Sequence, residues 1–508
     1  MKRRWWVIAA VALVMALFVG WSALASGPGF PLDDGWIHQT YARSLARNGR
    51  WEYTPGVVSA GSTSPLWTLL LAVSYVLRLP YLFWAFFLGG LSLLWLALAG
   101  MQVWRVFWPE WAGKDWLAGL TLVLTWPLVW GAASGMETIL FAALGVQIVA
   151  WYGRLVLHAG EHPDWQQVAA LGFLSGLLIL TRPDGVVLVL LVIVGLLLRP
   201  VRWGMRLQGV VVYGLLTAVP LLPYFAFNLA ASGSIWPNTF YAKQAEYQAL
   251  LTTPLAGRFV SLLYFSLGGP ASGWRGISSA HLLLLPGLIV AGWQALMADG
   301  RSRLLVRTLP LWWAGGHVLL YAWRLPVTYQ HGRYLFAALP IWVLYGLAGW
   351  LWLGEKAGNG RQARILKQTA RLTFALLLLL FVFLGAQSYA QDVAFIEGEM
   401  VDAAHWLAAN TPPDALIAAH DIGAIGYFAE RPLLDLAGLI SPEIIPLLAD
   451  EVTLAAYVRA SDAAYLVTAP GWEYLTLTTD PEIHLLYSTD FAWTEAQGVN
   501  GTAVYKLP

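Results

Sequence analysis

The chain has 508 residues, of which 58% are hydrophobic and 12% charged, and its mean hydropathy is +0.61. Soluble globular chains are about a quarter charged, so this composition excludes an ordinary soluble protein. The absence of cysteine excludes disulfides and thiolate metal sites, and the formal net charge of +1 conceals an uneven distribution.

The two ends of the chain differ in charge. After residue 394 there are sixteen acids and three bases, a net charge of −13, which leaves +14 for residues 1–394. We therefore predict a transmembrane domain at 1–394, with an amphipathic outer-face loop at 26–64, and a small extracytoplasmic α/β domain at 395–508. Short apolar runs predict strands of that domain near residues 415–418, 433–434 and 464–467.

Apolar runs of about 20 residues, long enough to cross a bilayer, recur as far as residue 389. We predict a polytopic α-helical membrane protein with about eleven spans, near residues 5–25, 82–106, 116–134, 137–157, 167–181, 184–198, 207–230, 279–297, 306–323, 334–353 and 372–389. Two stretches stay open. Residues 65–79 cross, re-enter or lie in the interface, and 167–198 is either two short helices or one kinked helix.

Four basic groups predict the orientation. By the positive-inside rule they face the cytoplasm, which puts the first loop and the C-terminal domain outside the plasma membrane. The groups are Lys2-Arg3-Arg4, Arg199 with Arg202 and Arg206, Arg301 with Arg303 and Arg307, and the five bases from Lys356 to Arg371. An alternative, a signal peptide cleaved after Ala23-Leu24-Ala25, would leave the first loop outside as well.

Two adjacent acids, Asp33 and Asp34, stand in that first loop, within a domain that has only thirteen acids. Asp34, His38 and Tyr41 share one face of a predicted amphipathic helix on the outer surface. One Asp would suffice to cap this helix, whereas two adjacent carboxylates repel unless a cation, a metal or proton exchange compensates. We therefore predict a functional role for at least one of them.

Three cations on separate predicted outer loops, Arg182, Lys243 and Arg333, suit a phosphate-bearing lipid headgroup. We place His331 with them. The alternative is that each cation is an interfacial side chain, with Arg182 paired to Asp184 in its own loop.

Further polar and aromatic residues at predicted outer boundaries are assigned to substrate binding. Besides His38 and Tyr41, they are Trp67, Glu137, Asn238 and Tyr241. Trp67 could instead belong to a helix start in the interfacial aromatic belt. There is no phosphate-cradling Gly-rich loop, GxSxG elbow or HExxH motif, so nothing supports a nucleotide-consuming enzyme or a hydrolase.

Several motifs follow one order: DDGWIHQTYARSLARNG, GSTSPLWTLLLA, SGMET, TRPDG, PNTFYAK, GRYL, HDIGAIGYF and LLDLAGL. This series resembles the GT-C superfamily of polyprenyl-phosphate-sugar glycosyltransferases. Within it, the series is most similar to the terminal β-(1→2)-arabinofuranosyltransferase-like membrane proteins. Thr40 stands where the arabinosyl pattern usually has Arg, and Ala60-Gly61 stands where it has Glu-Gly, so the sugar stays open.

The resemblance implies inverting transfer of a sugar from a polyprenyl-phosphate donor to a glycan, glycolipid or protein acceptor of the cell envelope. Asp33 or Asp34 would be the general base, while the other would orient the acceptor or help hold a divalent cation such as Mg, Mn or Ca. Glu137 resembles a second acid of the related aminoarabinose transferases. Membrane lipids are the other expected partners, no nucleic acid is expected, and the oligomeric state is open.

Two other functions remain to be compared with this one. A lipid-linked sugar flippase or polysaccharide exporter should have charged residues deep in its spans and related halves, neither of which is evident. A scaffold whose outer domain holds glycan would leave the Asp pair unexplained.

Overall fold

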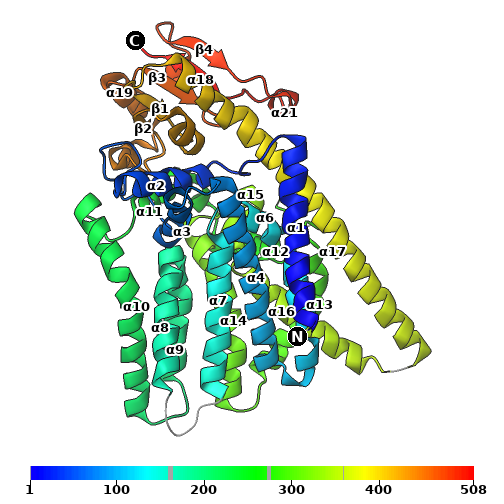
Figure 1. Ribbon diagram of the computed structural model, residues 1–508. Coiled ribbons are helices and arrows are strands. Elements are labelled where there is room, and N and C mark those ends of the chain that lie inside the picture. Colours follow the sequence, from blue (N-terminus) through cyan, green and yellow to red (C-terminus); the bar gives the residue numbers. More distant parts are fainter. Residues whose placement is uncertain (1, 158–163, 272–275, 359) are drawn as a thin grey trace.

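The computed structural model describes residues 2–157, 164–271, 276–358 and 360–508. Most of the chain forms a helical bundle, and a smaller domain with a β-sheet covers one end of it (Figure 1). The bundle and its surface helices are α1 (Lys2–Ala25), α2 (Asp34–Asn48), α3 (Pro65–Val76), α4 (Tyr81–Phe107), α5 (Asp115–Val123), α6 (Trp126–Ala133), α7 (Thr138–Leu157), α8 (Trp165–Thr181), α9 (Val186–Leu197), α10 (Trp203–Ser232), α11 (Asn238–Glu246), α12 (Leu255–Ser266), α13 (Leu285–Leu296), α14 (Arg301–Arg324), α15 (Tyr329–Gly332), α16 (Leu339–Lys356) and α17 (Arg361–Ile396).

Within the described residues, five helices are long and apolar enough to cross a membrane: α1, α4, α7, α10 and the continuous helix that includes α17. The number becomes seven if two bent pairs, α5 with α6 and α15 with α16, each count as one span. The count of about eleven is therefore not confirmed. At 306–323 the 24-residue α14 is long enough but not apolar enough to be counted, and shorter helices occupy the remaining predicted positions.

The two stretches left open by the sequence differ in structure. Residues 167–198 form two helices, α8 and α9, and the chain reverses direction between them at 182–185 (Figure 1). Residues 65–79 contain only the 12-residue α3, which lies at the end of the bundle beside the C-terminal domain (Figure 1). At about 1.5 Å per residue α3 is too short to cross a bilayer.

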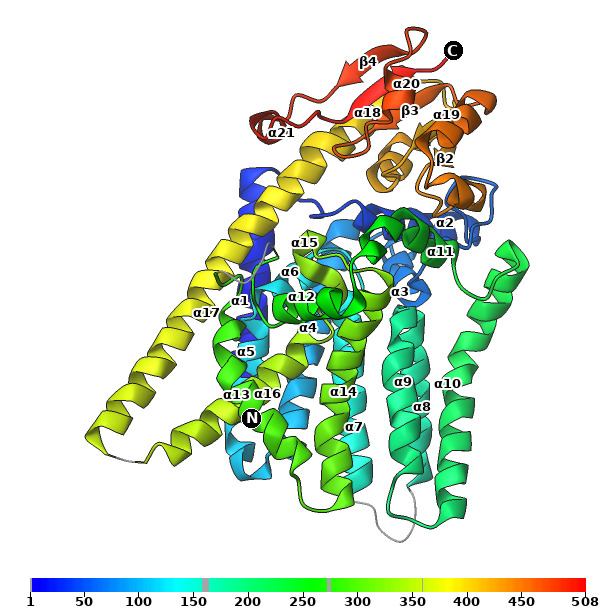
Figure 2. The ribbon, with the colours of Figure 1, turned by 180° about the vertical axis from the view of Figure 1, so that it is seen from behind.

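Helices α2 and α11 lie crosswise between the bundle and the C-terminal domain (Figures 1 and 2). The amphipathic helix predicted after the Asp pair is α2, and it ends where Gly49 takes the left-handed conformation at φ 66°. Trp36 anchors its buried face, because its ring packs against Phe30, Tyr427 and Phe428. The first loop is thus fixed to both the bundle and the C-terminal domain.

One helical segment of 50 residues, Arg361–Asn410, connects the bundle to the C-terminal domain. It comprises α17, one π-helical stretch at Glu397–Val401, and α18 (Asp402–Asn410), so the predicted boundary at 394/395 falls inside a continuous helix. The domain's other elements are β1 (Ile417–Ala419), β2 (Leu433–Asp435), α19 (Glu451–Ala460), β3 (Tyr465–Thr468), α20 (Leu475–Thr478), β4 (His484–Ser488), α21 (Ala492–Ala496) and β5 (Ala503–Lys506).

The strands form one five-stranded sheet in the order β2-β1-β3-β5-β4. The pairs β1–β2 and β1–β3 are parallel, whereas β3–β5 and β4–β5 are antiparallel. The three apolar runs expected to be strands are β1, β2 and β3, which confirms those predictions. As is typical of strands buried on both faces, every residue of these three is buried.

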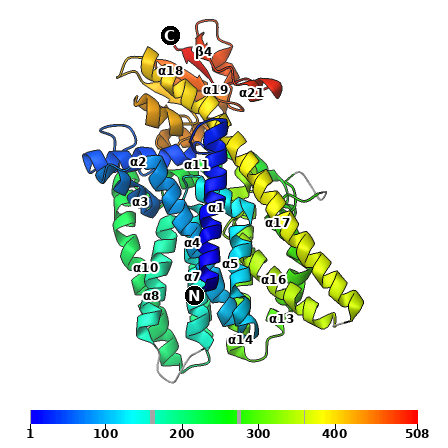
Figure 3. The ribbon, with the colours of Figure 1, turned by 45° about the vertical axis from the view of Figure 1, so that its right-hand side comes forward.

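The described parts of the basic groups gather at the end of the bundle away from the C-terminal domain. The α9–α10 turn, the start of α14 and the α16–α17 turn all lie there, and the N-terminus points the same way (Figures 1 and 3). The first loop, with Asp33 and Asp34, lies at the opposite end.

Candidate functional site

A cavity of about 410 Å³ lies at the end of the bundle covered by the C-terminal domain. Its walls come from α2, α11, the end of α14 and several connecting loops. Seven residues predicted as site residues line it: Asp34, His38, Tyr41, Glu137, Arg182, Lys243 and Arg333. Segments separated by up to about 300 positions in the sequence thus meet around one space.

Asp34, the first residue of α2, faces this cavity and forms an ion pair with Arg333. The Asp34 side chain is 30% exposed and that of Arg333 is 3% exposed. Burial alone would raise the pKa of Asp34, but the charges of Arg333 and Lys243 outweigh burial and hold the pKa below its ordinary value. Asp34 is therefore an ionised carboxylate at neutral pH, in contact with the cavity.

Only one of the three guanidinium nitrogens of Arg333 is hydrogen-bonded to a described residue. Nη2 reaches Asp34 and the Tyr334 hydroxyl, while Nε and Nη1 are buried without a hydrogen-bond partner among the described residues. Buried donors of this kind are costly unless a ligand or water satisfies them. Arg333 is therefore equipped to hold an anion beside Asp34.

Asp33 points away from this cavity and does not line it. Its carboxylate accepts hydrogen bonds from the backbone N–H groups of Gly423 at 2.6 Å and Ala424 at 2.7 Å, in the C-terminal domain. Burial raises the pKa of Asp33 to about 8, with a further contribution from Asp421, although the two N–H groups oppose the rise. No side-chain capping bond from Asp33 to α2 is present, so helix capping does not explain it.

Arg182 is bound by two carboxylates. Its Nη1 lies 2.8 Å from Glu137 and its Nε 3.2 Å from Asp184, while Nη2 donates to the Tyr321 hydroxyl. Glu137 is 1% exposed and also lies 3.2 Å from His38 Nε2. Pairing of Arg182 within its own loop, the simpler alternative from the sequence, is therefore present. This buried network leaves Arg182 without a free face for a phosphate.

Lys243 is also paired, at 2.9 Å from Glu246 on the same helix α11. Tyr41 is buried, and its hydroxyl lies 2.9 Å from that of Ser59. Both side chains nevertheless line the cavity, so they contribute a cation and a hydroxyl to its wall.

Besides Asp33, four residues predicted for the site do not line the cavity. Trp67 is buried and donates to the Gly135 carbonyl, Asn238 is buried at the start of α11, and Tyr241 contacts the Ser234 hydroxyl at an exposed position. His331 lies 2.7 Å from Asp392 and against the edges of two tryptophans. The substrate-binding or phosphate-binding roles predicted for these four residues stay predictions.

His331 affects the site indirectly through the backbone. Gln330, His331 and Gly332 are all left-handed, with φ of 50°, 56° and 70°, immediately before Arg333. Non-glycine residues in this region are strained and persist where surrounding contacts hold them, as the Asp392 contact holds His331. The turn delivers Arg333 to Asp34.

Sequence reasoning missed Arg324, which lines the cavity at the end of α14. Its Nη2 donates to the Gln244 side chain, and its guanidinium lies 3.8 Å from the ring centre of Phe240. Among the cations lining the cavity, it is the one with no carboxylate partner in the described residues. The only sequence signal was a lone Arg at the end of an apolar run.

The C-terminal domain also contributes to the cavity wall, through Leu439 and Ile440. Asp435, at the end of β2, accepts hydrogen bonds from the N–H groups of Ala437 and Ile440 and so shapes this loop. The loop packs closely on Gly61, where a Cβ would lie 2.6 Å from the Leu439 carbonyl oxygen. The LLDLAGL motif therefore both shapes this loop and contributes to the cavity wall.

The Asp pair does not form a joint metal site. Asp33 is bound by two N–H groups and Asp34 by a guanidinium, and the two face different partners. No group of three or more metal-ligand side chains occurs in the described ranges. The residues present therefore do not fit a divalent cation held between Asp33 and Asp34.

Comparison with known families gives one match. Residues 387–504, which include the end of α17 and the C-terminal sheet, match a family described as "Domain of unknown function (DUF8728)". No curated protein matches the chain. The activity of the C-terminal domain therefore has no precedent from this comparison.

Solved structures resemble the chain over most of its length. ArnT from Cupriavidus metallidurans bound to undecaprenyl phosphate is 18% identical, with 99% of this chain and 98% of that chain covered and a TM-score of 0.59. The oligosaccharyltransferase AglB from Archaeoglobus fulgidus, in complex with an inhibitory peptide and a dolichol-phosphate, is 10% identical, with 91% and 69% covered and a TM-score of 0.61.

Arabinofuranosyltransferase AftD from Mycobacteria matches at 14% identity, with 99% of this chain and 41% of that chain covered, but its TM-score is 0.47. The sugar therefore stays open. At these identities the structural likeness establishes the fold, and it confirms the resemblance predicted from the ordered motifs. The chain shares the fold of ArnT and AglB over most of its length, as the resemblance to GT-C proteins predicted, and its described residues include five to seven helices long and apolar enough to cross a membrane.

Proposed function

We propose that this protein is a membrane glycosyltransferase that moves a sugar from a polyprenyl-phosphate donor to a cell-envelope glycan, glycolipid or protein. The observation that carries the proposal is the ion pair of Asp34 with Arg333 on a cavity whose other cations are Arg182, Lys243 and Arg324. An ionised carboxylate beside buried guanidinium donors is what transfer from a phosphate-linked sugar requires.

The reaction is a single displacement at the anomeric carbon. The acceptor hydroxyl oxygen forms the new glycosidic bond while Asp34 takes the hydroxyl proton. The bond from the anomeric carbon to the phosphate oxygen breaks, its electron pair stays on the lipid phosphate, and the configuration inverts. Because cations stabilise the departing phosphate, no general acid is needed to protonate it.

The donor phosphate binds to Arg333 and Arg324. Arg333 has two unpartnered N–H-bearing nitrogens, and Arg324 has no acid partner in the described part of the chain. The apolar side of the cavity, including Val186, Leu320 and Trp323, suits an isoprenoid chain. ArnT and AglB, whose fold this chain shares, have been solved with undecaprenyl phosphate and with a dolichol-phosphate.

Asp33 fixes the first loop to the C-terminal domain and does not act on substrate. This division assigns the base to Asp34 alone, because Asp34 reaches the cavity and Asp33 does not. Leu439 and Ile440 bring the C-terminal domain to the cavity wall, which supports a role of this domain in binding the acceptor.

The active site faces the extracytoplasmic side of the plasma membrane. The described basic segments lie at the opposite end of the bundle, which by the positive-inside rule is cytoplasmic (Figure 1). The transmembrane and extracytoplasmic domains proposed at 1–394 and 395–508 then lie on the two sides of the site.

Purified protein in vesicles, given a radiolabelled polyprenyl-phosphate sugar and a cell-envelope extract as acceptor, tests the proposal. We expect label to appear in a water-soluble or lipid-extracted acceptor and polyprenyl phosphate to be released. A flippase would instead move the intact donor across the bilayer without breaking its phosphate–sugar bond, and that result would contradict the proposal.

A further inference from the structure

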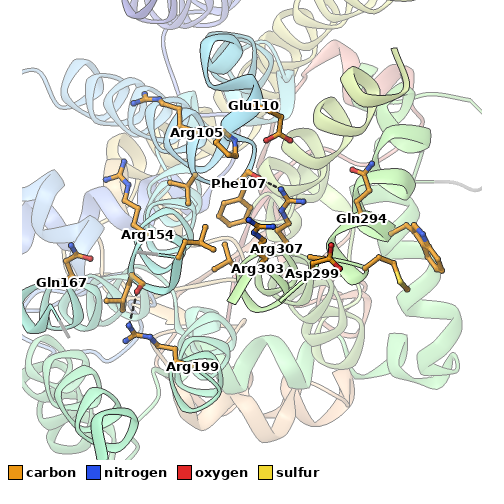
Figure 4. Close-up of a pocket in the computed structure, with 18 of the residues that line it drawn as sticks. Arg105, Phe107, Glu110, Arg154, Gln167, Arg199, Gln294, Asp299, Arg303 and Arg307 are labelled. Atoms are coloured by element: carbon orange, nitrogen blue, oxygen red, sulfur yellow. Dashed lines mark hydrogen bonds between the residues drawn. The ribbon is translucent and has the colours of Figure 1, made fainter. Parts of the chain in front are cut away.

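A second cavity, of about 1280 Å³, lies at the end of the bundle opposite the Asp34 cavity. Five arginines and three acids line it, which gives the lining a net positive charge. The arginines are Arg105, Arg154, Arg199, Arg303 and Arg307 (Figure 4). They come from the end of α4, the end of α7, the α9–α10 turn and the start of α14, so four separate segments contribute arginines to the lining.

Arg199 is the least exposed of these arginines, at 6%. Its Nη2 donates to the Leu155 carbonyl at 3.1 Å, while Nε is buried without a hydrogen-bond partner among the described residues. No carboxylate lies within ion-pair distance of Arg199 in that part of the chain. A buried guanidinium without an acid is costly unless an anion compensates it, so this side chain points to a ligand.

Arg303 and Arg307 extend the same positive surface one turn apart on α14. Arg307 donates through Nη2 to the Phe107 carbonyl at 2.9 Å, and neither arginine is paired with a carboxylate in the described ranges. Arg105 differs, because Asp115 lies 2.8 Å from its Nε. Arg199, Arg303 and Arg307 thus carry positive charges that no carboxylate among the described residues neutralises.

The positive-inside rule alone explains why arginines occur at this end, as Arg361 and Arg364 also do. It does not explain why they converge in a cavity or why one of them is buried. Part of the wall is apolar and accessible: Trp293 is 63% and Met297 57% exposed. A basic pocket between helices with an apolar wall is what an anionic lipid headgroup binds.

We propose that this cavity binds phosphate groups of anionic phospholipid, at Arg199 and at Arg303 with Arg307, with the Trp293 and Met297 wall taking the apolar part of the lipid. Arg suits this role because its planar fork holds two phosphate oxygens at once. The site is separate from the sugar-transfer cavity, and its ligand comes from the leaflet or the solution on the cytoplasmic side.

The test is binding of dioleoylphosphatidylglycerol to the purified full chain in phosphatidylcholine nanodiscs, measured by native mass spectrometry. Arg303→Gln is expected to weaken binding about tenfold, since it removes one charge-assisted contact. Arg199→Lys keeps the charge but loses the fork, and should also weaken binding. The control Arg361→Gln/Arg364→Gln removes two charges at the same end outside the cavity and should change binding less than about twofold. A thermal melt of each variant verifies folding.

Inorganic phosphate and glycerol phosphate form the second arm. If they bind with the same dependence on Arg303 and phosphatidylglycerol binds no better, the phosphate comes from solution rather than from lipid. Equal weakening of binding in the control variant would overturn the proposal. So would a protein that binds phosphatidylglycerol no more tightly than phosphatidylcholine and that does not bind phosphate.

Discussion

Asp33 and Gly423 are 390 positions apart in the chain, yet the Asp33 carboxylate accepts a 2.6 Å hydrogen bond from the Gly423 N–H. This contact joins the first loop of the bundle to the C-terminal domain. It also directs Asp33 away from the cavity that its neighbour Asp34 lines. The two adjacent acids therefore have different partners: Asp33 contacts the C-terminal domain and Asp34 faces the cavity.

Asp33→Asn should loosen the contact between the domains. Asn has one acceptor oxygen, so one of the two N–H groups at Gly423 and Ala424 loses its partner, at about 1–3 kcal/mol. Gly423→Ala should act in the same direction, because a Cβ there would overlap the Asp33 carbonyl oxygen. We expect faster cleavage near residue 410 in limited proteolysis and a lower melting temperature. The control Asp462→Asn, at an exposed position in the same domain, should leave the cleavage rate at residue 410 unchanged.

Arg324→Gln should weaken donor binding while the fold persists, because no carboxylate among the described residues would be left unpaired. Loss of one charge-assisted contact to phosphate predicts a roughly tenfold higher KM for the polyprenyl-phosphate sugar. Initial-rate kinetics measure it. Arg202→Gln, a cation at the opposite end, is the matched control, and equal KM values for the two variants would remove Arg324 from the donor site.

The pH–rate profile should show the effect of Arg333 on Asp34. The folded pKa of Asp34 lies below its ordinary value, so the active, ionised form persists as pH falls until that lowered pKa is reached. Arg333→Gln removes the charge that does most to lower the pKa of Asp34, so burial raises that pKa. The acid limb of the pH–rate profile should therefore move to higher pH. Arg333→Lys keeps the charge and should keep the limb near its original position. An acid limb at the same pH in all three proteins would show that Asp34 is not the titrating group.

The orientation can be measured directly because the chain has no cysteine. Thr479→Cys, exposed in the C-terminal domain, should react with a membrane-impermeant maleimide in intact cells. Gln362→Cys, exposed near the start of α17, should react only after the membrane is permeabilised. The reverse pattern would place the Asp34 cavity on the cytoplasmic side.

Local patterns in the sequence predicted those elements whose structure depends mainly on residues close together in the chain. The amphipathic helix after Asp34 and the apolar strands β1 to β3 depend on neighbouring residues. The pairing of Arg182 with Asp184 is equally local, but it was only the alternative to the phosphate-binding role predicted for Arg182. The ordered motifs also gave the fold. The span count was less secure, since several apolar runs form helices too short to be counted and the 24-residue α14 is not apolar enough.

The roles of individual site residues depended on contacts that no local pattern contains. The Asp33–Gly423 and Asp34–Arg333 pairs join segments about 300 to 400 positions apart, so the sequence could not separate the two acids. Arg324 was missed because a single Arg at the end of an apolar run looks like any interfacial cation. Trp67 and His331 looked suitable for substrate, but their partners are Gly135 and Asp392.

The assignment of the base to Asp34 is tested most directly by sugar transfer in vesicles with Asp34→Asn and Asp33→Asn proteins of verified fold. A general base contributes about 10²- to 10⁴-fold, so Asp34→Asn should lose at least about 100-fold in kcat. Asp33→Asn should retain most of its kcat while showing the weaker domain contact. Transfer that persists in Asp34→Asn but is abolished in correctly folded Asp33→Asn would contradict the assignment.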